Sequence, residues 1–113
     1  KSKSMDIISK ELSKCGAQNI ENVGLLYPYS LFDIRYELNG QIRYAIVANT
    51  STKVNYFNLS IKRNIFFHAF NECCDLFLIT NILEKPKINK YNVEKLDYLN
   101  KTINSIKFTD EGE

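Results

Sequence analysis

The sequence is poor in the residues from which metal sites and disulfide frameworks are built. Its 113 residues include three cysteines, one histidine and no tryptophan, and they contain no Cys-x-x-Cys pair. An odd and low cysteine count indicates free thiols in a reducing compartment, so we expect an intracellular, cytoplasmic location. Cys73 and Cys74 are adjacent and His68 is nearby, but a zinc site needs further ligands, so we expect buried thiols and no metal there.

Long apolar runs and a strong net charge are also absent. No apolar run is long enough to span a bilayer, and the polar start KSKSMD has no signal-peptide core, so we expect no membrane partner. The net charge of +2 gives no field that attracts nucleic acid over a distance. This balance favours a protein partner over unspecific DNA binding, which draws on many basic residues.

The length fits one domain over residues 1–113, with an apolar share of 44% that can build a modest core. We expect this domain to be part of a longer protein. Its core is predicted at about 5–82, with a C-terminal helix at about 92–106.

Apolar spacing predicts the elements of this core. A first helix runs from about Met5 to Lys14, because apolar side chains recur there at helical spacing and Gly16 can end it. Asn39 and Gly40 give the strongest hairpin signal, because both residues tolerate positive φ. Alternating or continuously apolar segments predict strands at 19–26, 32–38, 41–49, 53–59 and 75–82.

Two further helices are expected in the second half of the chain. Ser60 can cap a helix from about Ile61 to Cys74, and a basic connector at 84–90 leads to a last helix from about Val93 to Ile106. On the helix expected at 61–74, Phe67 points away from the centre of the apolar stripe, so either the last helix or a partner covers it. Phe67 is therefore the candidate partner-binding residue. The stripe itself consists of Ile61, Ile65, Phe66, Ala69, Phe70 and Cys73.

These elements predict an α/β (α+β) fold with the order α-β-β-β-(β)-α-β-α. A mixed central sheet of four to five strands would be flanked by helices. The helix that starts after Ser60 would connect two parallel strands by a right-handed crossover.

The order and a few short motifs resemble the restriction-endonuclease-like, PD-(D/E)xK superfamily. Within it, the chain is similar to the small domain that closes plant NO VEIN-type proteins and many bacterial defence proteins. The pieces that carry the resemblance are Phe32-Asp33-Ile34, the segment RYAIVANTS at 43–51, YFNLS at 56–60, Asn64 and LFLI at 76–79. The resemblance covers about residues 7–82 and implies a restriction-endonuclease-like fold.

The superfamily uses an Asp and a Glu to hold divalent cations, and a Lys two residues after the Glu beside the attacked phosphate. Only Asp33 matches this pattern, because Ile46 stands at the expected acid position and Ala48 at the expected lysine position. An Ile side chain has no oxygen with which to bind a hard cation. The resemblance therefore implies a vestigial site at Asp33 without a bound metal. Mg²⁺ would bind only if another acid, such as Glu11, supplied the missing carboxylate; Lys53 or Lys62 could then replace the missing Lys beside the phosphate.

A local basic patch is the candidate nucleic-acid site. Lys53, Lys62 and Arg63 cluster around the expected start of the second helix, where free backbone N–H groups favour an anion. The alternative is an ordinary solvated rim.

Three functions follow as hypotheses. The first is a non-catalytic, nuclease-like binding or scaffold module that docks a protein partner, the rest of the parent chain or a nucleic acid inside a larger defence or nucleic-acid-processing protein. The second is a metal-dependent nuclease with rearranged ligands around Asp33. The third is a structural domain that self-associates through an exposed strand or through Phe67.

Overall fold

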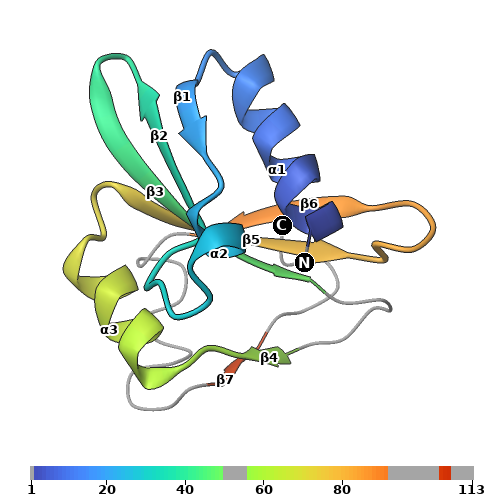
Figure 1. Cartoon of the computed structure of the whole chain (residues 1–113). Helices are drawn as coiled ribbons and strands as arrows, with labels where there is room; N and C mark the ends of the chain where they lie inside the picture. Colours follow the sequence, from blue (N-terminus) through green and yellow to red (C-terminus); the bar gives the residue numbers. More distant parts are fainter. Residues whose placement is uncertain (1, 50–55, 92–104, 108–113) are drawn as a thin grey trace.

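A mixed five-stranded sheet with a helix on each face forms the body of the protein (Figure 1). The computed structural model describes residues 2–49, 56–91 and 105–107. In chain order the elements are α1 (Ser2–Lys14), β1 (Gln18–Glu21), α2 (Val23–Leu26), β2 (Ile34–Leu38), β3 (Gln41–Asn49), β4 (Tyr56–Asn58), α3 (Ile61–Ala69), β5 (Cys74–Thr80), β6 (Lys87–Tyr91) and β7 (Ser105–Lys107).

The strand order in the main sheet is β1-β2-β3-β5-β6. β1, β2 and β3 pair antiparallel, β5 lies parallel to β3 after the α3 connection, and β6 returns antiparallel along β5. Asn39 and Gly40 make the β2–β3 turn with φ values of 53° and 78°, which residues other than Gly and Asn rarely adopt. The predicted hairpin and the predicted mixed sheet with flanking helices are confirmed.

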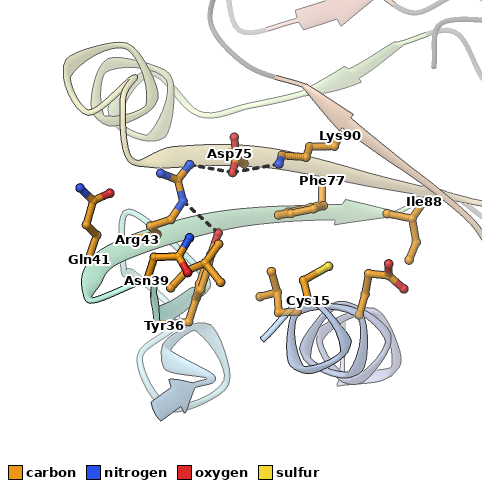
Figure 2. A pocket seen from close by; sticks show the side chains of 12 residues that line it. Cys15, Tyr36, Asn39, Gln41, Arg43, Asp75, Phe77, Ile88 and Lys90 are labelled. Carbon is orange, nitrogen blue, oxygen red and sulfur yellow. Dashed lines mark hydrogen bonds and ion pairs between the residues drawn. The ribbon is translucent and has the colours of Figure 1, made fainter. Parts of the chain in front are cut away.

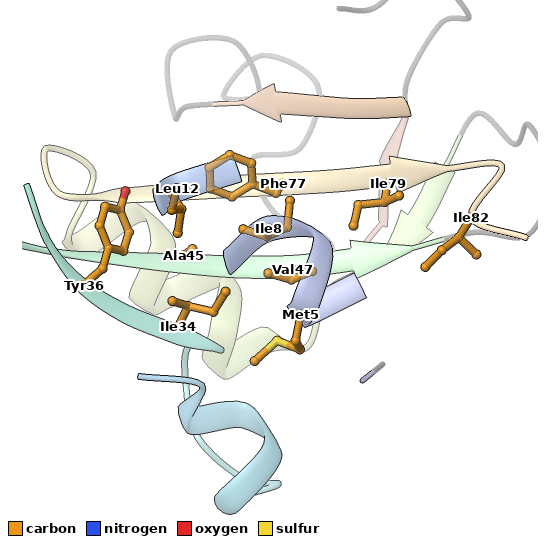
Figure 3. Close-up of a cluster of buried hydrophobic side chains, with 10 residues drawn as sticks. All are labelled: Met5, Ile8, Leu12, Ile34, Tyr36, Ala45, Val47, Phe77, Ile79 and Ile82. Atoms are coloured by element: carbon orange, nitrogen blue, oxygen red, sulfur yellow. The ribbon is translucent and has the colours of Figure 1, made fainter. Parts of the chain in front are cut away.

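The helix α1 covers one face of the sheet, which we call the α1 face (Figure 3). Met5, Ile8 and Leu12 fall on one side of the helix, as their spacing predicts, and all three are buried. They pack on alternate residues of the central strands, including Val47 and Ile79. Each buried side chain of this size contributes about 1.5–3 kcal/mol relative to an exposed one, so this layer is a main source of stability.

The other face, which we call the α3 face, is covered by α3. Phe66 and Phe67 of this helix pack against Ile46, Leu76 and Leu78 of the two central strands. Both β3 and β5 are covered on both sides. This explains why each strand contains a run of consecutive apolar residues.

The segment expected as one strand at 19–26 consists of two elements. β1 ends at Glu21, and the short helix α2 follows at Val23–Leu26. Asn19 has a positive φ of 52°, and the β1–β2 register shifts between Gln18 and Glu21, so the strand is irregular from its start. Alternation over so few residues did not distinguish a strand from a turn that leads into a helix.

The helix expected at 61–74 is shorter, and its inner side differs from the prediction. α3 ends at Ala69, and Cys74 belongs to β5, where it pairs with Tyr44. Ile61 and Ile65, which were assigned to the apolar stripe, are 62% and 63% exposed. The strand pairing explains the early end, because the chain must turn after the helix to bring Cys74 beside β3.

The C-terminal part also differs from the prediction. The segment expected as a basic connector contains β6, which begins at Lys87 and pairs with β5 through Ile79 and its neighbours. Most of the predicted last helix, 93–104, lies outside the described residues. Its expected end is not helical, because Ser105–Lys107 forms β7 and pairs antiparallel with β4. The predicted strand at 53–59 is described only from residue 56, where β4 begins.

All three cysteine side chains are free thiols, with Cys15 exposed, Cys73 half-buried and Cys74 buried. Of the helices in the described ranges, none combines the length and the apolar character needed to cross a bilayer.

Candidate functional site

The predicted site centres on Asp33, which directly precedes β2. The backbone N–H of Asp33 donates to the carbonyl oxygen of Ala45 at 2.8 Å, so the residue lies against the middle of β3. Its side chain is on the α3 face, because the neighbouring Ile34 belongs to the cluster on the α1 face and side chains alternate along a strand. The carboxylate is buried, with 1% of the residue exposed.

Charged and polar contacts hold this carboxylate. Its Oδ1 lies 2.7 Å from Nη2 of Arg63, which comes from the first turn of α3. Its Oδ2 accepts a hydrogen bond from the backbone N–H of Val47 at 2.7 Å. The side chain therefore joins β2, β3 and α3. A carboxylate can be buried here because its charge is paired and hydrogen-bonded.

The backbone of α2 closes the site from a third side. The N–H of Gly24 donates to the carbonyl oxygen of Asp33 at 2.8 Å. A Cβ atom at position 24 would collide with Oδ1 of Asp33 and lie 3.1 Å from its Cα. Only glycine allows this close approach of backbone to carboxylate, so the residue type at position 24 is tied to the ion pair.

Ile46 and Ala48 lie on β3 next to Asp33, as the resemblance implies, and both contribute to the core. Ile46 is 1% exposed and belongs to the cluster on the α3 face, and Ala48 packs against that cluster. The position beside Asp33 is thus filled with apolar side chains.

The donor set around Asp33 does not fit a divalent cation. Mg²⁺ prefers several oxygen ligands, and here one carboxylate is offered that already contacts a guanidinium and a backbone N–H. Across residues 2–49, 56–91 and 105–107, no three His, Cys, Asp or Glu side chains come together in a way that could hold a metal ion.

The predicted basic patch is only partly present in the described chain. Lys62 is exposed, but Arg63 is turned inward to Asp33, and its Nε–H donates to the carbonyl oxygen of Leu31 at 3.5 Å. Lys53 lies outside the described residues. The Arg63 guanidinium is therefore engaged in holding the fold, and its prediction as a phosphate ligand is not supported by its position.

Phe67 occupies a different place from the predicted one. It is fully buried between α3 and the sheet, in one cluster with Ile46 and Leu59. The prediction that it forms a surface for a partner is therefore wrong in this structure. The physical reason is the rotation of α3, which directs Phe66 and Phe67 inward and leaves Ile61 and Ile65 outside.

A second polar cluster, which the sequence reasoning missed, lies on the opposite face of the sheet, the α1 face (Figure 2). Asp75 is only 5% exposed, and its Oδ2 lies 3.1 Å from Nη2 of Arg43 and 3.7 Å from Nζ of Lys90. Arg43 also donates to the carbonyl oxygen of Glu72 at 3.1 Å and to the hydroxyl oxygen of Tyr36 at 3.4 Å. An acidic residue at the start of the apolar run DLFLIT was the signal, because such a residue needs a buried partner.

The protonation behaviour of this end of the sheet follows from burial and pairing. Burial raises the pKa of Tyr36, against the opposing effect of its hydrogen bond from Arg43. For Arg43, burial acts to lower the pKa, but the hydrogen bonds to Tyr36 and Asp75 outweigh it and the pKa is raised. Burial also raises the pKa of the Cys74 thiol to about 12. The Cys74 side chain is thus neutral at physiological pH and suited to packing, and not to nucleophilic chemistry.

Comparisons of the chain with family models, characterised proteins and solved structures find no match. The likeness to the nuclease superfamily therefore stays a prediction, which depends on the residues around Asp33 and on the order of the elements.

Proposed function

We propose that the protein is a non-catalytic binding module with a nuclease-like arrangement of strands, and that it docks another protein. The observation that supports this proposal is the state of Asp33. Its carboxylate pairs with Arg63 at 2.7 Å and accepts the Val47 N–H at 2.7 Å, beside the buried side chain of Ile46. A nuclease site of the superfamily would offer oxygen ligands and a lysine at these positions, and the chain offers packing instead.

The described surface favours a protein as the bound partner. α3 presents Ile61 and Ile65 to solvent, and the segment at 25–31 presents Leu26 and Tyr29, which are 73% and 97% exposed. We call these four residues the outer apolar surface. The hydrogen bond from Arg63 to the Leu31 carbonyl joins the segment at 25–31 to α3, so these two segments are neighbours. Large exposed apolar side chains on neighbouring segments are typical of protein contact sites.

A nucleic acid is the less favoured partner. Phosphate binding depends on several Lys and Arg side chains that can release counterions. Of the three basic residues predicted for this role, Lys62 is the one that the described chain exposes, while Arg63 is paired with Asp33. The net charge of +2 gives little long-range attraction. An intracellular location, and a place within a larger defence or nucleic-acid-processing protein, remain part of the proposal, and the three free thiols agree with a reducing compartment.

The absence of catalysis can be tested with metal ions. Mn²⁺ at about 1 mM should leave the amide NMR signals of Ile34 and Val47 unbroadened, and plasmid or single-stranded DNA should stay intact with Mg²⁺ or Mn²⁺. Asp6→Asn, a change of an exposed acid on α1, is the matched control for Asp33→Asn. Saturable Mn²⁺ binding or cleavage that is lost in Asp33→Asn and kept in Asp6→Asn would overturn the proposal and favour the metal-dependent nuclease.

Docking can be tested by photo-crosslinking in the cells that make the protein. A photo-reactive amino acid at position 65 should give one adduct with another protein, and the same amino acid at the exposed position 14 should not. Ile61→Lys should remove the adduct. An adduct with the mass of two copies would favour the self-assembly alternative, and adducts with nucleic acid or equal adducts from both positions would count against protein docking.

A further inference from the structure

A cavity of about 340 Å³ lies between α1 and the sheet, on the face of the sheet opposite to the Asp33 side chain (Figure 2). Leu12 of α1 and Cys15, which follows this helix, form one wall, and Phe77 of β5 with Ile88 of β6 forms the apolar part of the opposite wall. This volume is at the lower end of the range that small-molecule sites occupy. Most of its lining surface is apolar, with a few polar and charged groups, which is the composition typical of such sites.

The charged end of the cavity consists of Arg43, Asp75 and Lys90. Both cations face the same carboxylate oxygen of Asp75, at 3.1 Å and 3.7 Å, so this end has one positive charge more than it has negative charges. Arg43 has five N–H groups, and three of its donor atoms are held by Tyr36, Glu72 and Asp75. This arrangement fixes the guanidinium in place before any ligand arrives, which lowers the entropic cost of binding.

The charges of the lining also limit which anions fit. Glu11 of α1 lines the same cavity, so the two acids and the two bases cancel over the whole wall. A phosphate dianion or a polyanion would gain little from a wall without net charge. A ligand with a single carboxylate gains binding energy when that group contacts Arg43 and Lys90, where positive charge is in local excess. The apolar part of the same ligand then lies against Leu12 and Phe77.

We propose that this cavity binds a small monocarboxylate with an apolar body, whose carboxylate is held by Lys90 and Arg43. The apolar body lies between α1 and the Phe77–Ile88 wall. The site is independent of the proposed docking function, because it is on the opposite face of the sheet from Asp33 and α3.

Binding can be measured with three probes: phenylacetate, 3-phenylpropionate and indole-3-acetate. Amide NMR titrations of the whole chain should show saturable shifts around Leu12, Leu38 and Phe77 at about millimolar concentration, which is the affinity that ligands of this size reach. The neutral amides of the same three acids should bind about fivefold more weakly, because they cannot form the charged contact.

Lys90→Gln should reduce the affinity for the acids about fivefold and leave the affinity for the amides unchanged. Lys90 is exposed, so this variant keeps the fold. Lys87→Gln is the matched control, because it removes the same charge from the same strand at a position that does not line the cavity. The proposal is overturned if none of the acids binds at about 10 mM. Equal binding of acids and amides, or equal loss in both lysine variants, would also overturn it.

Discussion

The carboxylate of Asp33 and the guanidinium of Arg63 form a buried ion pair, 2.7 Å apart, between the start of β2 and the first turn of α3. On the sheet side, the backbone N–H of Val47 donates a hydrogen bond to the same carboxylate at 2.7 Å. Breaking one side of such a pair leaves a charge buried without compensation, which is more costly than removing both partners.

The ion pair predicts a specific pattern of stabilities. Arg63→Gln should lower the free energy of unfolding by about 3 kcal/mol, because the Asp33 carboxylate then stays buried without its cation. The double variant Asp33→Asn/Arg63→Gln should recover part of this loss. Lys62→Gln removes the same charge from the exposed neighbouring position and should change stability by less than about 0.5 kcal/mol. Urea unfolding of the wild type, the single variants Asp33→Asn, Arg63→Gln and Lys62→Gln, and the double variant measures these losses. Strictly additive losses at positions 33 and 63 would contradict the pairing.

Gly24 gives a second prediction. Gly24→Ala should lower the free energy of unfolding by about 1–3 kcal/mol, because the added Cβ collides with the Asp33 carboxylate. The cost should shrink when Asp33 is changed to Ala, since Oδ1 is the nearest atom to the new methyl group. Thermal unfolding of both single variants and the double variant tests this. A neutral Gly24→Ala variant would show that α2 does not approach Asp33 as described.

The orientation of α3 gives a third prediction. Phe67→Ala should destabilise the protein by about 3–5 kcal/mol, because Phe67 is fully buried and its loss leaves a cavity. Ile65→Ala should cost less than about 0.5 kcal/mol, because that side chain is 63% exposed. Phe67 faces the sheet and Ile65 faces solvent from the same helix. Comparing the two losses in free energy of unfolding, measured in urea, therefore reports the rotation of α3. Similar losses would mean that both faces are covered.

The Cys74 thiol gives a prediction about pH. Its pKa in the folded protein is about 12, above the ordinary value of 9.0, because the side chain is buried. The folded state therefore keeps a proton that the unfolded state releases, so stability is lost as the pH rises from about 9 toward 12, by up to about 1.4 kcal/mol per pH unit. The slope should be smaller in Cys74→Ala than in Cys15→Ala, whose thiol is exposed. Urea midpoints between pH 8 and pH 10.5 measure it, and identical slopes would contradict the burial of Cys74.

The sequence predicted the sheet better than its surroundings, for a physical reason. The hairpin at Asn39–Gly40 and the buried strands at 41–49 and 74–80 have local signals, since turn chemistry and continuous apolar runs depend on few residues. α2 and β6 lack such signals. Their conformations depend on contacts with distant residues, such as Gly24 with Asp33 and Ile88 with Ile79, which no short window contains.

For the candidate site, the sequence indicated the hairpin next to Asp33 and not the contacts that the Asp33 side chain makes. The pairing of the hairpin places Asp33 beside β3, since its N–H donates to the carbonyl oxygen of Ala45, the residue before Ile46. The sequence could not indicate that Arg63 would turn inward, because a basic residue in the first turn of a helix can face either solvent or the sheet. Which way it faces is decided by the rotation of α3, and the sequence places apolar residues on both sides of that helix.

The parallel pairing of β3 and β5 has a consequence for the order of folding. β2 and β3 are joined by a tight turn, so this pair can form early and on its own. β5 reaches its place beside β3 only after the chain from Asn49 to Cys74 has closed into a loop, which costs conformational entropy before any contact compensates for it. The slow step of folding is therefore expected to be the docking of β5, with the hairpin already formed.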